Sequence, residues 1–395
     1  MARKKAPQTI AASAGIAQDT AFGAVTPPLY TSTTFSFAGY QSAREHDYSR
    51  TSNPTRSLLG ETLADLERGA GAVVVSSGMA AVDLVLSQVG PDDLVLAPHD
   101  CYGGTQRLLS ARHEKGQFDL AFVDQGDERA FELAMDGAPS LILVETPSNP
   151  LMRVVDIAAI VARAQKIGAK VAVDNTFLSP ALQRPLVLGA HFVIHSTTKY
   201  LNGHSDVVGG AVIAADKADA EALAAWANTT GVTGSPFDAY MTLRGLRTLF
   251  PRIAQQQETA FAIAAYLERH PLVHAVHYPG LPSHPGHAIA RAQQSGFGAM
   301  LSFELADGVD GVRAFVESVQ LFTLAESLGG IESLVAHPAT MTHANMSEQA
   351  RRTAGITGGL LRLSVGLEAE DDLLADLEQA LVAVRTAVAH RRYAV

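Results

Sequence analysis

The chain has 395 residues, enough for two domains of about 150 residues or more. With 47% hydrophobic and 18% charged residues, it has the composition of a globular protein rather than a disordered one. A net charge of −10 argues against a nucleic-acid or anionic-membrane partner, and the one cysteine, Cys101, excludes an intramolecular disulfide and a cysteine-based zinc cluster.

Residues 1–57 are rich in Thr, Ser, Pro and Tyr and show no sustained helical or strand period. We interpret them as an extended arm rather than a domain. The first residues, MARKKAPQTIAASAGIAQD, lack the continuous apolar core of a secretory signal, and no run of about 18 apolar residues indicates a membrane span. A cytoplasmic location is therefore expected.

A repeating pattern begins after the arm, with a helix that ends near Gly69. Short β-branched runs are the predicted strands: AVVVSSG (72–78), DLVLAP (93–98), LAFVDQ (120–125), LILVETP (141–147), KVAVDNT (170–176), FVIHST (192–197) and GGAVIAA (209–215). Helical stretches such as 79–89 and 156–168 lie between them. Strands that alternate with helices predict a mostly parallel sheet covered on both faces.

The pattern changes near residue 250, after the helical segment 245–271. Two further strands, 298–305 and 360–368, and a closing helix over 370–392 predict a smaller α+β domain. The expected organisation is thus an arm (1–57), a first domain (58–250) and a C-terminal domain (251–395).

Polar residues follow several of the predicted strands, where ligands of parallel sheets bind. The turn 76–79 opens a helix and suits a phosphate group. Asp174 follows one strand, and Ser196, Thr198 and Lys199 follow another. Pyridoxal phosphate needs a lysine for its Schiff base, a carboxylate at its ring nitrogen and a phosphate clamp, so this set predicts that cofactor.

Each of these residues also has an ordinary interpretation. Lys199 suits a solvated strand end, Asp174 a helix cap, and Tyr102, which we expect to stack on the cofactor ring, the edge of a core. Their joint occurrence favours the cofactor. The segment GHSDV (203–207) has Val207 where a hydrolase nucleophile turn needs glycine, and the histidines lack the helical spacing of zinc ligands, so no metal site is expected. Cys101 has no identifiable activating partner, and we interpret it as structural.

Several motifs closely resemble the Cys/Met-metabolism family of pyridoxal-phosphate enzymes over nearly the whole chain. They are YSRTSNPTR (48–56), SSGMAA (76–81), CYGGTQRL (101–108), ETPSNP (145–150), VDNTFLSP (173–180), HSTTKYLNGHSDVVGG (195–210), AESLGGIESLVAHPATMTHA (325–344) and LRLSVGLE (361–368). The resemblance implies the aspartate-aminotransferase-like fold (fold type I), with a seven-stranded, mostly parallel sheet and a smaller C-terminal α+β domain.

The resemblance also implies the roles of individual residues. Lys199 is then the Schiff-base lysine, with a pKa lowered by burial and positive charge; Asp174 pairs with the ring nitrogen and Tyr102 stacks on the ring. The implied phosphate ligands are Gly78, Met79, Ser196 and Thr198. Tyr48 and Arg50 are implied to reach the phosphate that is bound in the neighbouring subunit. The implied substrate-binding residues are Arg362, which holds the α-carboxylate, and Ser327 and Asn149 near it. Glu326 and Arg107 are the implied contacts to the distal part of the substrate.

The implied reaction is γ-replacement of an O-acylhomoserine, such as O-succinylhomoserine, by cysteine. The segments 97–108, 122–128, 226–234 and 332–344 favour it, whereas YPGLPSHPGH (278–287) and the segment 361–381 are equally similar to enzymes of γ-elimination. A relative without activity is a third possibility, against which Lys199, Asp174 and Arg362 argue. The expected assembly is a homotetramer, a dimer of dimers with shared active sites.

Overall fold

The larger sheet dominates the computed structural model, which describes residues 5–344, 346 and 348–392. Within these residues this sheet has seven strands in the order β1-β7-β6-β5-β4-β2-β3. They are β1 Gly71–Val75, β2 Leu94–Pro98, β3 Asp119–Val123, β4 Leu141–Glu145, β5 Lys170–Asp174, β6 Phe192–Ser196 and β7 Gly210–Ala214. Only β7 is antiparallel to its neighbours β1 and β6 among the described strands. The predicted sheet is confirmed.

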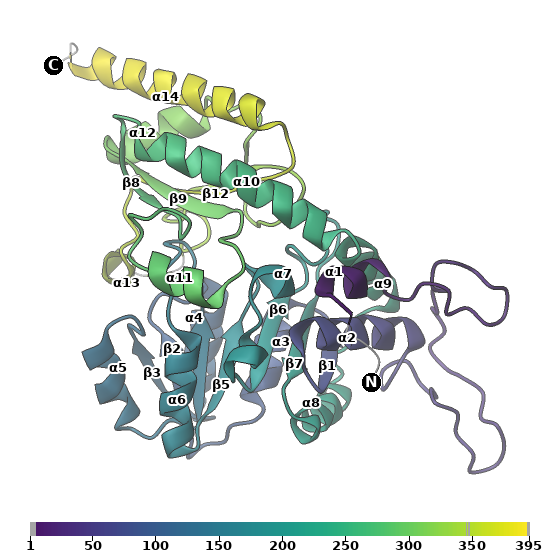
Figure 1. Cartoon of the computed structure of the whole chain (residues 1–395). Helices are drawn as coiled ribbons and strands as arrows, with labels where there is room; N and C mark the ends of the chain where they lie inside the picture. Colours follow the sequence, from purple (N-terminus) through teal and green to yellow (C-terminus); the bar gives the residue numbers. More distant parts are fainter. Residues whose placement is uncertain (1–4, 345, 347, 393–395) are drawn as a thin grey trace.

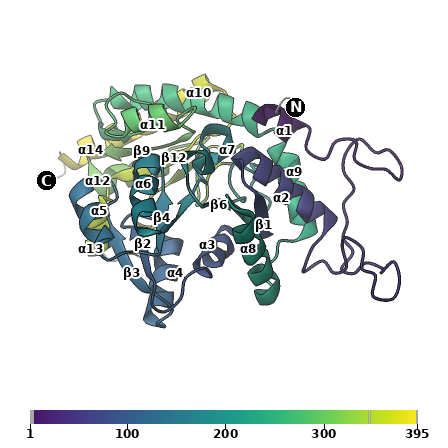
Figure 2. The same cartoon turned by 60° about the horizontal axis from the view of Figure 1, so that its bottom comes forward.

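Helices cover both faces of this sheet (Figures 1 and 2). One face packs against α3 Gly78–Leu86, α4 Gly103–Glu114 and α8 Lys217–Thr230, and the other against α2 Pro54–Glu67, α5 Glu128–Met135 and α6 Ile157–Ile167. Successive residues of β5 alternate between the two cores, with Ala172 on the α3 side and Val171 and Val173 on the α6 side. Both faces are therefore apolar, which explains the apolar runs in the sequence.

The remaining elements up to residue 268 lie outside the larger sheet and the helices named above. They are α1 Pro7–Ala12, α7 Ser179–Leu182, a 3₁₀ turn at Pro185–Leu188, α9 Pro236–Leu246 and the long helix α10 Leu249–Glu268. The predicted boundary at residue 250 lies at the start of α10. Because α10 packs on the smaller sheet, it belongs mainly to the C-terminal layer.

The smaller sheet, in the described part of the chain, has five strands in the order β10-β11-β12-β9-β8. Its elements are β8 Val273–His277, α11 His287–Gln293, β9 Met300–Leu305, α12 Gly308–Val316, β10 Thr323–Leu324, β11 Leu334–Ala336, α13 Glu348–Ala354, β12 Leu360–Ser364 and α14 Glu370–Arg392. Helices α10, α12 and α14 lie on its outer side (Figure 1). Among the described helices, none is long and apolar enough to cross a membrane.

The segment between α1 and α2 extends away from the rest of the molecule (Figures 1 and 2). Residues 54–57, expected to be part of the arm, instead form the first turn of α2. The Asn53 side chain accepts the N–H groups of Thr55 and Arg56, and Pro54 takes the first helical position, so Asn-Pro is here a helix start rather than a turn. The short helix α1 packs on α2.

Candidate active site

A cavity of about 450 Å³ lies where β4, β5 and β6 end and the C-terminal domain faces them. Its walls contain most of the residues that the sequence predicted: Gly78, Met79, Tyr102, Arg107, Asn149, Asp174, Ser196, Thr198, Lys199, Glu326, Ser327 and Arg362. Its size is within the range of small-molecule sites. The strand-end residues thus come together with residues that lie far away in the sequence.

Lys199 lies in the turn after β6, and its Nζ donates a hydrogen bond of 2.8 Å to Ser327 Oγ. Burial and the nearby Arg362 guanidinium lower the pKa of Lys199 to about 8, while Glu326 acts in the opposite direction. Burial and a neighbouring positive charge, the two causes expected to lower the pKa of Lys199, are thus both present in the structure. An amine with this pKa exchanges protons readily near neutral pH.

Arg362, on β12, is 2% exposed and lies across the cavity from the sheet. Its Nη1 donates to Asn149 Oδ1 (2.9 Å) and its Nη2 donates to the Ser327 carbonyl (2.8 Å). Its Nε is buried without a partner in the described structure. Ser327 has φ of 85°, a left-handed conformation that is costly for serine, and this turn presents its hydroxyl to Lys199 and its carbonyl to Arg362.

Asp174 and Glu145 end the neighbouring parallel strands β5 and β4 as register partners. The Asp174 carboxylate accepts the N–H of Thr176 (2.9 Å). Burial raises the pKa of Asp174, and burial together with Asp174 raises the pKa of Glu145 well above its ordinary value. Two carboxyl groups this close and this buried do not both ionise readily, and a cation beside them, such as a protonated ring nitrogen, would stabilise the ionised form.

The turn from β1 into α3 is shaped for an anion. Ser77 caps α3 by accepting the Ala80 N–H (3.1 Å), so the first N–H groups of the helix face the cavity wall. Gly78 is required there, since a Cβ on it would lie 2.7 Å from the Cβ of Ser196. The Thr198 hydroxyl exchanges hydrogen bonds with the backbone of Gly209, which holds the turn before Lys199.

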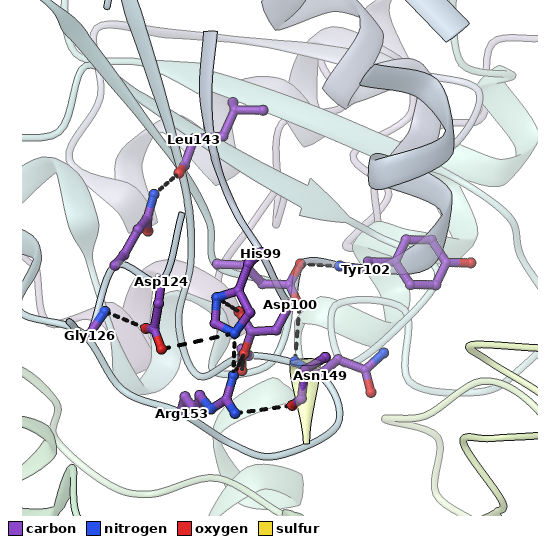
Figure 3. Close-up of polar contacts among 12 residues, drawn as sticks. His99, Asp100, Tyr102, Asp124, Gly126, Leu143, Asn149 and Arg153 are labelled. Atoms are coloured by element: carbon purple, nitrogen blue, oxygen red, sulfur yellow. Dashed lines mark hydrogen bonds and ion pairs between the residues drawn. The ribbon is translucent and has the colours of Figure 1, made fainter. Parts of the chain in front are cut away.

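Tyr102 precedes α4, and its side chain is 43% exposed along the cavity. Glu145 accepts its backbone N–H (2.8 Å) and also that of Asn149 (3.0 Å) (Figure 3). Arg107 and Glu326 are exposed and line the same cavity. Cys101 is buried, and its pKa is raised well above the ordinary value by burial and by Glu145, as suits a structural thiol.

Tyr48 and Arg50 are not among the residues that line the cavity. They lie on the extended arm, where the Arg50 guanidinium is 5.7 Å from the centre of the Tyr48 ring. Several wall residues, Glu145 and Thr176 among them, had no role in the sequence prediction. Glu145 ends a parallel strand, as Asp174 does, so the expectation that ligands bind at the ends of such strands could have predicted it.

The whole chain was compared with known proteins. The model of the Cys/Met metabolism PLP-dependent enzyme family matches residues 8–382. The chain belongs to this family. The cofactor of this family is pyridoxal phosphate, so the cofactor predicted from the sequence is confirmed. The fold type I architecture is confirmed as well.

Relatives of this family member include enzymes of both predicted reactions. Cystathionine gamma-synthase of Escherichia coli K12 is 55% identical over 96% of this chain and 98% of its own. A solved structure of cystathionine gamma synthase from Xanthomonas oryzae pv. oryzae in complex with cystathionine is 55% identical, with a TM-score of 0.97 over 98% of this chain and 100% of that one. Cystathionine gamma-lyase from Lactobacillus plantarum is 40% identical, with a TM-score of 0.93 over 96% and 100%.

The residues of the cavity fit pyridoxal phosphate. The glycine at position 78 leaves room for an anion beside Ser196, and Lys199, Asp174 and Tyr102 occupy different walls of the same cavity. These are the three side-chain types that the cofactor's aldehyde, ring nitrogen and ring face require.

Proposed function

We propose that this family member is a cystathionine γ-synthase. It replaces the acyloxy group of O-succinylhomoserine, or another O-acylhomoserine, with the thiol of cysteine, in the transsulfuration route to methionine. The observation that carries the proposal is the contact chain Lys199–Ser327–Arg362, which supports a proton-transferring amine beside a guanidinium for the substrate. The 55% identity to the Escherichia coli synthase supports this reaction.

Pyridoxal phosphate, when bound, supplies an aldehyde that takes up the substrate amino group and a ring that accepts electrons from the α-carbon. The protein residues then position and move protons. In this proposal Asp174 keeps the ring nitrogen protonated, Tyr102 covers the ring face, and the α3 N-terminus with Gly78 and Met79 holds the phosphate, together with Ser196 and Thr198.

Arg362 binds the α-carboxylate, because its fork of donors matches a carboxylate and it has a free, buried Nε. Asn149 and the Ser327 carbonyl fix the guanidinium from the other side. Lys199 takes the α-proton and returns protons to neighbouring atoms; its pKa of about 8 allows both steps near neutral pH. Glu326 and Arg107, at the exposed part of the cavity, contact the distal end of the substrate.

The alternative is γ-elimination from cystathionine, as a cystathionine γ-lyase. It remains a candidate because the structure from Lactobacillus plantarum with that name has a TM-score of 0.93. Both reactions need the same amine, carboxylate and guanidinium. The higher identity to the synthases, 55% against 40%, favours γ-replacement.

One assay separates the two reactions. Purified holoenzyme is given O-succinylhomoserine with cysteine, O-succinylhomoserine alone, or cystathionine alone, and the products are measured. We expect cystathionine from the first mixture as the fastest reaction. Faster release of 2-oxobutanoate from cystathionine would contradict the proposal and identify a lyase. The Lys199→Ala variant is the control and should lose both the visible absorbance of the bound cofactor and turnover.

We further propose that the arm completes the site of a second subunit. Tyr48 is 48% exposed and, with Arg50, offers a hydroxyl and a guanidinium that do not line the candidate active-site cavity of their own subunit. A homotetramer built from two such dimers is the assembly proposed. The proposed location is the cytoplasm, which suits the single buried thiol of Cys101.

A further inference from the structure

Glu145 has no assigned role, yet it touches both walls of the site. Its Oε2 accepts the backbone N–H of Tyr102 and its Oε1 accepts that of Asn149. These two residues begin separate chain segments, one that leads into α4 and one that leads into the loop 149–156. Within the described residues, Glu145 is the one side chain that accepts both of these N–H groups.

Each of these two residues has a part in the proposed binding of a ligand. Tyr102 carries the ring proposed to cover the cofactor, and Asn149 holds the Arg362 guanidinium at 2.9 Å. A displacement of the Glu145 carboxylate is therefore transmitted in one direction to the cofactor and in the other to the α-carboxylate of the substrate. The two N–H groups point to a single carboxylate, which sets the distance between these segments.

The loop after Glu145 has a second, independent anchor on the side away from the cavity. Ser148 Oγ donates to Asp100 Oδ2 (2.7 Å), and Arg153 Nη1 donates to the same oxygen (3.1 Å) and contacts His99 Nε2 (2.8 Å) (Figure 3). Because no hydrogen bond of this anchor involves Glu145, we expect the loop to keep its fold when Glu145 is changed. The Glu145 carboxylate is thus available for adjusting the site rather than for holding the chain together.

We propose that Glu145 is a positioning residue, whose carboxylate aligns Tyr102 over the cofactor and Asn149 behind Arg362. The proposal rests on the roles given above to Tyr102 and Arg362. Glutamine at this position keeps the length but has one oxygen for two N–H donors, and its NH₂ group faces one of them without an acceptor. Losing one of the two hydrogen bonds should weaken the binding of the cofactor and of the substrate about tenfold.

The test compares Glu145→Gln, Glu145→Asp and Tyr102→Ala with the wild type. The first measurement is the dissociation constant of pyridoxal phosphate from the apoenzyme, and the second is KM and kcat for O-succinylhomoserine in the presence of cysteine. For Glu145→Gln we expect cofactor binding about tenfold weaker and KM about tenfold higher, with a smaller change in kcat. Aspartate keeps both carboxyl oxygens but is shorter, so it should give an intermediate loss.

Asp93→Asn is the matched control, since Asp93 also joins two chain segments, by accepting the Gly90 N–H (2.7 Å) and the Ser140 hydroxyl. It lies directly before β2, at the end of the strands opposite to the cavity, and should leave both measurements unchanged. Thermal unfolding of every variant reports stability separately.

Each outcome is decisive. If Tyr102→Ala weakens cofactor binding but Glu145→Gln stays within about twofold of the wild type, Glu145 is not a positioning residue. The same conclusion follows if Glu145→Gln lowers only the unfolding temperature. If Glu145→Gln does not fold, Glu145→Asp decides, and wild-type values for it overturn the proposal. If Tyr102→Ala binds the cofactor normally, the assignment of Tyr102 in the proposed function has failed instead.

Discussion

The titration of Lys199 provides a quantitative test of the site. Its pKa of about 8, lowered from 10.5, predicts that about 9% of the apoenzyme carries the free amine at pH 7, against about 0.03% for an ordinary lysine. The rate of capture of pyridoxal phosphate by the apoenzyme should follow this fraction. It should rise about eightfold from pH 7 to 8.5 and only about 1.3-fold from pH 8.5 to 9.5.

The assay is stopped-flow absorbance of apoenzyme mixed with pyridoxal phosphate at constant ionic strength. Removing the positive charge in Arg362→Gln should move the midpoint upward, and Glu326→Gln should move it downward, because Glu326 stabilises the protonated amine. Arg107→Gln is the control, since Arg107 lines the cavity but is not one of the charges that shift Lys199. A rate that still rises about ninefold between pH 8.5 and 9.5 would refute the reasoning, because the amine would then titrate as an exposed lysine.

Three further variants test other parts of the site. Asp174→Asn should retain pyridoxal phosphate, seen by its absorbance, but slow turnover at least about 100-fold, because an amide cannot hold the ring proton; near-normal kcat would exclude it as the ring partner. Gly78→Ala should weaken cofactor binding about tenfold or more in equilibrium dialysis, since the added Cβ meets Ser196 at 2.7 Å; unchanged affinity would mean that this turn does not hold the phosphate. Mixing Arg50→Ala with Lys199→Ala under subunit exchange should restore about a quarter of wild-type activity, as random pairing gives half hybrids with one intact site each; no recovery despite confirmed exchange would confine the arm to its own subunit.

The residues at the ends of the parallel strands could be predicted from the sequence pattern, whereas those on the opposite side of the site could not. Asp174, Ser196 and Lys199 were predicted because parallel strands bring their carboxyl ends to one edge of the sheet. Arg362 lies within β12 of a different sheet, and its approach to Asn149 depends on how the two domains pack. Spacing along the chain carries no information on that packing, so only the family resemblance indicated Arg362.

Local signals were ambiguous where two structures share the same residues. Asn53-Pro54 suits both a turn and a helix start, and the structure shows the helix start, with the Asn53 side chain capping α2. The run GGAVIAA predicted β7 correctly, but not that it runs antiparallel to β6. A strand buried on both faces has the same composition in either direction, since the covering helices determine its residues.

The pairing of β1 with β7 has a consequence for how the enzyme is made. Of its neighbours in the sheet, β1 hydrogen-bonds only with β7 among the described strands, so it stays unpaired on the ribosome until residue 214 has been synthesised. The turn 76–79, which suits a phosphate group, follows β1 directly. Arg362 is added later still, within the last tenth of the chain. A chain that stops before residue 362 therefore cannot form the complete site. It can present the residues proposed for the cofactor, but it lacks the guanidinium proposed to hold the substrate, so turnover requires synthesis to proceed past Arg362.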